Sequence, residues 1–85
     1  MHRNEVEDRL VAVLKIAECW LSREQLIEMS SLVGVGEPGV ALENLCTQLE
    51  EYDVAVPEDV LRELKEISSA MAMKVPPWLD GRRDA

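Results

Sequence analysis

Apolar residues recur at spacings of three and four in four separate stretches of this chain, and this periodicity constrains the fold more than any other feature. Such spacing places the apolar side chains along one face of an α-helix. No stretch alternates with the period of two that is typical of a half-buried strand. The four stripes are Val6, Leu10, Val13, Leu14, Ala17 and Leu21; Leu26, Ile27, Met29, Leu32 and Val33; Leu42, Leu45, Cys46, Leu49 and Tyr52; and Val60, Leu61, Leu64, Ile67 and Met71. The sequence therefore predicts an all-α fold, a compact bundle of four helices.

Capping residues indicate where the first two helices begin and end. The first is expected to run from an N-cap at Asn4 to Leu21. Ser22 and Gln25 have the spacing of a capping box, which predicts the start of the second helix. That helix should end near Gly34, a residue suited to a left-handed cap. Because the turn at Ser22 is short, the two helices are expected to be antiparallel neighbours.

Prolines mark the remaining boundaries. Pro38 and Pro57 are expected to open the third and fourth helices, since proline fits the first turn of a helix. The two prolines of "KVPPWLDGRRDA" cannot continue the fourth helix. We expect one helical domain over residues 1–85, with an ordered core at about 4–74 and an irregular tail at 75–85, because a chain of this size holds one small core.

The stretch "GVGEPG", from Gly34 to Gly39, has the spelling of a dinucleotide-binding fingerprint. That fingerprint requires a preceding strand and a βαβ unit, whereas the residues before it here indicate a helix. Glu37 would bring negative charge to the phosphates, and Pro38 removes an amide that could bind them. We interpret the stretch as a helix stop, a turn and a helix start. Gly39 costs about 1 kcal/mol relative to alanine in a helix, which favours close packing of a neighbouring helix there or, alternatively, close approach of a partner.

The charge of the chain is strongly negative, with a formal value of -8 at pH 7. Such a chain is expected to avoid nucleic acid and anionic membranes and to attract basic partners. Segment 36–56 contains five acidic residues and neither Lys nor Arg. A solvated face that maintains solubility is one interpretation. The lack of basic partners one turn away favours a partner-binding face instead, and its predicted residues are Glu37, Glu43, Glu50, Glu51 and Asp53.

Residue types used for catalysis and metal binding are scarce. His2 is the single histidine, and Cys19 and Cys46 have no histidine near them in the sequence. Zinc-type spacings and EF-hand loops are absent from the sequence. We therefore expect a protein that is not an enzyme and has no catalytic residues, metal or cofactor. Both cysteines are predicted to be reduced core residues, and the lack of a signal-peptide or membrane-spanning pattern favours a cytoplasmic protein.

The segment "GEPGVALENLCTQLEEYDVAVPEDVLRELKEI", residues 36–67, resembles the MafI-type family of bacterial toxin-immunity proteins. The "GEPG-ALENL" part carries most of this resemblance. The residues that fit the family pattern are Glu37, Gly39, Ala41, Leu42, Glu43 and Leu45; then Leu49, Glu51 and Asp53; and, more loosely, Val54, Pro57, Leu61 and Leu64.

The resemblance implies a small cytosolic helical protein that binds a cognate polymorphic toxin and blocks it. Many such toxins are nucleases with basic active sites, which agrees with the acidic third segment. We expect an immunity protein whose acidic helical face binds a basic toxin domain, and neither nucleic acid nor a membrane. The alternative is a small helical adaptor or regulatory subunit, either monomeric or homodimeric, that binds a partner helix through an apolar groove.

Overall fold

The computed structural model describes residues 2–80, so the last five residues of the predicted tail lie outside the described part of the chain. Over the described residues the chain is helical and contains no strand, which confirms the all-α prediction. Four α-helices are joined by short connections, and two short 3-10 helices follow the first and the last of them. Their bounds are α1 Arg3–Ile16, η1 Ala17–Cys19, α2 Arg23–Gly34, α3 Pro38–Glu51, α4 Glu58–Ala70 and η2 Pro77–Asp80.

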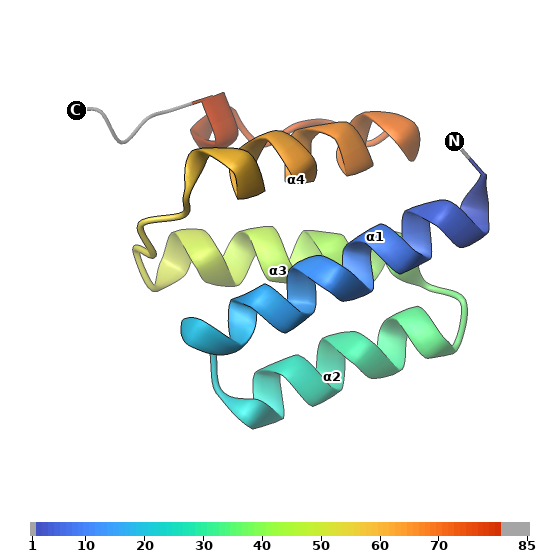
Figure 1. Cartoon of the computed structure of the whole chain (residues 1–85), viewed down its shortest axis with the longest axis horizontal. Helices are drawn as coiled ribbons and strands as arrows, with labels where there is room; N and C mark the ends of the chain where they lie inside the picture. Colours follow the sequence, from blue (N-terminus) through green and yellow to red (C-terminus); the bar gives the residue numbers. More distant parts are fainter. Residues whose placement is uncertain (1, 81–85) are drawn as a thin grey trace.

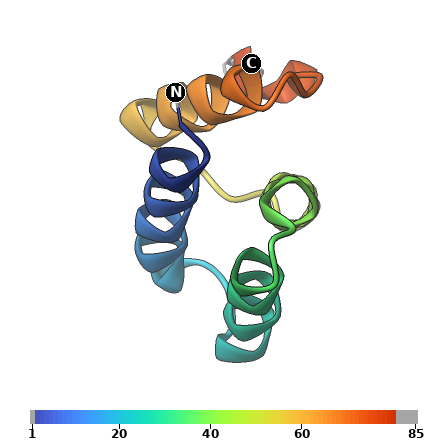
Figure 2. The same ribbon diagram turned by 90° about the vertical axis from the view of Figure 1, so that its right-hand side faces the viewer.

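The main helix contacts run in the order α4, α1, α2, α3, with a smaller contact between α1 and α3 (Figure 1). Helix α1 packs against both α2 and α4, and α2 packs against α3. Figure 2 shows α3 end-on, on the side of the molecule opposite α1, with one flank turned away from the other helices. This position leaves a long strip of α3 available to solvent.

The predicted apolar stripes form the core, with two exceptions. All six apolar residues predicted for the first stripe are buried, as are Leu42, Leu45, Cys46 and Leu49 of α3. Ile27 is 54% exposed because it lies almost on the opposite side of α2 from the buried Met29. Tyr52 is 62% exposed because it is the C-cap residue, one position beyond the last residue of α3. Neither residue therefore belongs to the buried core.

The buried core continues beyond Lys74, into the segment where an irregular tail was predicted. Pro76 and Pro77 do interrupt the helical pattern, but η2 then folds back against α4 (Figure 1). Trp78 and Leu79 are thereby buried, at 5% and 2% exposed. Two large apolar side chains of the tail are therefore part of the core.

The start of α2 follows the prediction, whereas the start of α1 does not. The Ser22 hydroxyl accepts a hydrogen bond from the Gln25 amide at 3.2 Å, and the Ser22 amide donates to the Gln25 side chain at 2.7 Å. This reciprocal pair is the predicted capping box. The N-cap of α1 is His2 rather than Asn4, and its side chain makes no capping bond. The helix therefore begins without a side-chain cap.

The glycine-rich stretch ends α2 in a Schellman motif. The Glu37 amide donates to the Leu32 carbonyl at 2.8 Å, and the Gly36 amide donates to the Val33 carbonyl at 3.1 Å. The left-handed residue is Gly36, with φ of 85°, whereas Gly34 is the last residue of the helix. The predicted helix stop is therefore present, but its left-handed position is two residues later than expected.

The same motif ends α3 and α4 without a glycine. Asp53 and Ala72 take the left-handed position, with φ of 53° and 55°. The Val54 amide donates to the Leu49 carbonyl at 3.0 Å, and the Met73 amide donates to the Ser68 carbonyl at 2.9 Å. Residues with a Cβ are strained in this conformation by about 1–2 kcal/mol. Both turns thus carry a local cost that the rest of the fold offsets.

Gly39 is not tightly packed among the described residues. A Cβ at this position would lie 3.5 Å from the Sδ atom of Met73, an ordinary van der Waals contact. Met73 belongs to the segment after α4, so the predicted close approach of a neighbouring helix was wrong. The fold itself leaves room for an alanine at this position.

Candidate functional site

Helix α3 presents three of the five predicted acidic residues on its outer surface. Its buried face anchors the helix, while Glu43, Glu50 and Glu51 are exposed. Glu43 and Glu50 are seven residues apart, which is about two helical turns and roughly 10 Å along the axis. Glu51 is displaced from Glu50 by about 100° around the helix. The three carboxylates therefore share one flank of α3, with Glu51 on its edge.

The other two predicted residues, Glu37 and Asp53, lie at the two ends of the helix. Glu37 is the N-cap residue and is exposed, and its side chain makes no capping hydrogen bond. Asp53 is the exposed left-handed residue that follows the C-cap. They are about 24 Å apart along the helix axis. The structure thus places them beside the outer flank but does not bring them together.

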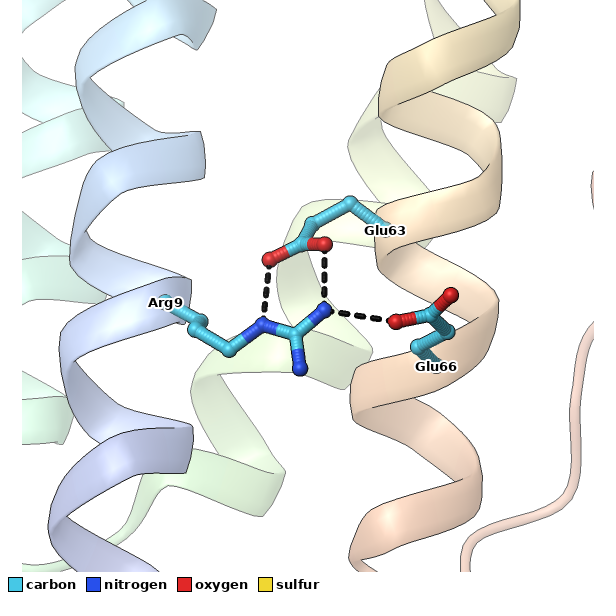
Figure 3. Close-up of polar contacts among 3 residues, drawn as sticks. All are labelled: Arg9, Glu63 and Glu66. Atoms are coloured by element: carbon cyan, nitrogen blue, oxygen red, sulfur yellow. Dashed lines mark hydrogen bonds and ion pairs between the residues drawn. The ribbon is translucent and has the colours of Figure 1, made fainter. Parts of the chain in front are cut away.

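The carboxylates of this flank differ from the acidic groups that face α1. Among the side chains that the structure describes, no basic group lies within 4.0 Å of the carboxylates of Glu43, Glu50 and Glu51. In contrast, Glu63 and Glu66 of α4 both contact the guanidinium of Arg9 (Figure 3). The charge of the outer flank is therefore uncompensated by ion pairs in the described part of the protein.

A groove with a volume of about 310 Å³ runs along this flank, between α3 and the segment that follows α4. Its floor is apolar and its rim is charged. Carboxylates border it on the α3 side and one amine borders it on the other. The lining residues are Leu42, Glu43, Cys46, Thr47 and Glu50 of α3, and Met73, Lys74, Pro76 and Trp78 of the later segment.

The two cysteines have different environments. Cys46 is 4% exposed, and burial, with a smaller contribution from Glu50, raises the pKa of its thiol to about 12. It is therefore protonated at neutral pH and a poor nucleophile. Cys19 is exposed at the end of η1, so the prediction that it lies in the core was wrong. The 3-10 turn buries Ala17 and directs the next two residues outward.

Of the nine residues that line the groove, only Glu43 and Glu50 were predicted from the sequence to bind a partner. Trp78 could have been suspected, because a large apolar residue shortly after a helix often folds back over the core. Lys74 gave no such signal, since its approach to Glu43 and Glu50 depends on how the chain packs after α4. The sequence segment 36–56 lacks a basic residue, but the folded surface acquires one from elsewhere.

The described residues offer little else that could act on a ligand. No group of three or more His, Cys, Asp or Glu side chains between residues 2 and 80 is arranged to hold a metal ion. None of the helices in that range combines the length and the apolar character needed to cross a membrane. Comparison with models of known protein families, with curated proteins and with solved structures finds no match to this chain.

Proposed function

We propose that this chain is a cytoplasmic immunity protein that binds and neutralises a basic bacterial toxin domain through the outer flank of α3. The observation that carries the proposal is the set of exposed carboxylates of Glu43, Glu50 and Glu51, which have no ion-pair partner within residues 2–80. The resemblance of residues 36–67 to the MafI-type family supports a toxin as the partner.

The energetics of such a contact favour carboxylates that are unpaired beforehand. An internal ion pair would have to be broken before its carboxylate could meet a partner, whereas Glu43 and Glu50 can exchange water for a cation directly. A negative flank also steers a basic protein toward it and can raise the association rate constant by 10-fold or more. These effects fit a protein that must capture a toxin quickly.

The proposed toxin is a nuclease, because nuclease sites concentrate Arg and Lys side chains to hold phosphates. Carboxylates spaced along a rigid helix can occupy positions that phosphates would take. In this role α3 contributes geometry and charge, and the chain itself performs no reaction. Glu37 and Asp53 would contact the edges of such a site, where exposed charges contribute less to affinity.

The test first establishes whether the reading frame immediately upstream encodes a secreted protein with a variable C-terminal toxin domain, and then uses that domain. Its affinity is measured by calorimetry for the natural chain and for a variant with Glu43, Glu50 and Glu51 replaced by Lys. We expect the dissociation constant to rise at least about 100-fold, since like charges at an interface cost several kcal/mol. The same affinity for both proteins would contradict the proposal.

A matched control keeps the change in net charge but moves it to another surface. Glu18, Glu24 and Glu28 are exposed and lie on η1 and α2. Their replacement by Lys is expected to change the dissociation constant by less than about fivefold, through long-range steering alone. An equal loss in both triple variants would mean that net charge, and not the flank of α3, determines binding.

A second candidate function, a homodimeric adaptor, is favoured by the outer face of α2. Ile27 and Val35 are exposed there, at 54% and 74%, and a wide hollow of about 760 Å³ lies beside Leu26 and Ile27. Light scattering of the purified chain distinguishes the two functions. A dimeric mass that becomes monomeric on the substitution Ile27→Glu would favour the adaptor, and a monomeric mass would count against it.

A further inference from the structure

We infer that the groove between α3 and residues 73–78 binds a single arginine side chain presented by the partner protein. The inference rests on the proposed function for the identity of the partner, and it names the chemistry of the contact. It uses four features of the groove: its size, its apolar floor, its acidic rim and the lysine that faces this rim.

The size of the groove suits one side chain. Its volume of about 310 Å³ is at the lower limit of the range typical of small-molecule sites, about 300–1,000 Å³. A helix or an extended peptide would need a longer depression. The groove is therefore expected to bind one long side chain while the rest of the partner contacts the surrounding surface.

The floor provides an apolar surface for the stem of that side chain. Leu42 and Trp78 close the bottom of the groove and are only 1% and 5% exposed, so the accessible apolar surface comes mainly from the partly buried Met73 and Pro76. Long basic side chains bury their methylene groups along such surfaces and keep the charged end in water. Cys46 also lines the floor, and its buried thiol has no hydrogen-bond partner within residues 2–80.

The rim provides the charge complementarity. Glu43 and Glu50 lie on the same side of the groove, with Thr47 between them. Because their Cα atoms are separated by about 10 Å along the helix, a cation at the level of Thr47 can approach both carboxylates. Arginine fits better than lysine, since its planar group offers several donors in a fixed fork and is more weakly hydrated. Neither carboxylate has to leave an existing ion pair.

Lys74 lies on the opposite rim of the groove. Its amine is exposed and, within the described chain, is not within 4.0 Å of any carboxylate. A positive charge at this position repels an arriving guanidinium and partly neutralises the potential of Glu43 and Glu50. Removal of the charge should therefore increase the affinity of the groove for arginine, an effect that a purely structural role of Lys74 does not produce.

The experiment uses N-acetyl-arginine N-methylamide as the probe and the isotopically labelled full chain as the protein. Binding is followed by NMR through the indole signal of Trp78 and the amide of Thr47, with the indole signal of Trp20 as an internal reference. We expect a saturable shift at Trp78 that the norleucine analogue does not produce. The lysine analogue should bind more weakly than the arginine analogue.

Variants then identify the groups responsible. Glu50→Gln and Glu43→Gln should each weaken binding by roughly two- to fivefold, the size of one solvent-screened ion pair. Lys74→Gln should strengthen it by a similar factor. Glu24→Gln is the matched control, because it removes the same charge at an exposed residue of α2 that does not line the groove.

Each result separates the inference from the proposed function. Equal losses for Glu24→Gln and Glu50→Gln, or a saturable Trp78 shift with norleucine, would overturn the inference of an arginine groove. Toxin binding that depends on Glu43, Glu50 and Glu51 but not on Lys74 would preserve the function and reject the groove. Conversely, arginine binding in the groove without any affinity for the upstream-encoded domain would reject the function alone.

Discussion

Arg9 of α1 and Glu63 of α4 form a two-point ion pair although they lie 54 residues apart in the sequence (Figure 3). The Nε and Nη2 atoms of Arg9 donate to the two carboxylate oxygens of Glu63 at 2.6 and 2.5 Å. The Nη2 atom also donates to Glu66 at 2.7 Å. This contact joins the first and last α-helices of the fold.

This ion pair predicts a specific dependence of stability on pH. Hydrogen bonding to Arg9 lowers the pKa of Glu63, more than burial raises it. The stabilisation is therefore fully present above the pKa of Glu63 in the unfolded chain, about 4.3, and is lost as the pH falls through the lower folded value. Glu63→Gln should be less stable than the natural chain at pH 7, and the difference should shrink below about pH 4.

Urea denaturation between pH 7 and pH 3 checks this prediction. Glu51→Gln is the control, because Glu51 has no ion-pair partner within residues 2–80, and this variant should retain the acid sensitivity of the natural chain. A constant difference between Glu63→Gln and the natural chain across the whole range would show that the ion pair does not contribute to acid unfolding.

Ala72→Gly is predicted to stabilise the protein. Ala72 has a φ of 55°, and a glycine adopts this left-handed conformation without the Cβ strain. After the larger entropy loss of glycine on folding is subtracted, we expect a gain of about 1 kcal/mol in the free energy of unfolding. Ala70→Gly, in the last turn of α4, should instead destabilise it by about 0.5–1 kcal/mol. Chemical denaturation measures the free energy of unfolding of both variants, which should rise for Ala72→Gly and fall for Ala70→Gly. A loss of stability in both would refute the prediction.

Gly39→Ala is also predicted to be stabilising, for a different reason. The new methyl group would make an ordinary contact with Met73 at 3.5 Å. Alanine favours the helix over glycine by about 0.5–1 kcal/mol. The thermal midpoint of the variant should therefore rise. If it falls, the space beside Gly39 is tighter than the structure indicates. A stabilised variant that has lost affinity for the toxin domain would support close approach of the partner at this residue.

Leu79→Ala is predicted to destabilise the protein strongly. Leu79 is 2% exposed, and truncation of a fully buried leucine typically costs about 2–5 kcal/mol. Val35→Ala is the comparison, since Val35 is 74% exposed and should change stability by less than about 0.5 kcal/mol. The free energies of unfolding of both variants provide the measurement. Similar small effects would mean that η2 is not part of the core.

The helices could be predicted because their signals are local. The spacing from Val6 to Leu21 defines one face of α1, and every residue of that stripe is buried. The pair Ser22 and Gln25 marks the start of α2, and the observed hydrogen bonds follow this pattern. Apolar periodicity and capping depend only on neighbours within a turn or two, so a single sequence contains enough information to locate them.

The remaining features depend on how distant segments pack. Nothing near Ala72 signals a left-handed residue, because tertiary structure imposes that conformation where a glycine would be expected. Asp53 gives only a weak signal, since aspartate tolerates this conformation better than most residues with a Cβ. Likewise, the acidic residues of α3 could be listed from the sequence, but the groove beside them could not. It requires the chain to return past α3 after α4, which brings Lys74 and Trp78 to the same surface.

The most direct test of the central claim is the NMR footprint of the upstream-encoded toxin domain on the labelled chain. If the outer flank of α3 binds the toxin, the largest changes should occur at Glu43, Thr47, Glu50 and the Trp78 indole. They should be lost when Glu43, Glu50 and Glu51 are replaced by Lys. Changes confined to α2 around Ile27 and Val35, or no binding at all, would contradict the account.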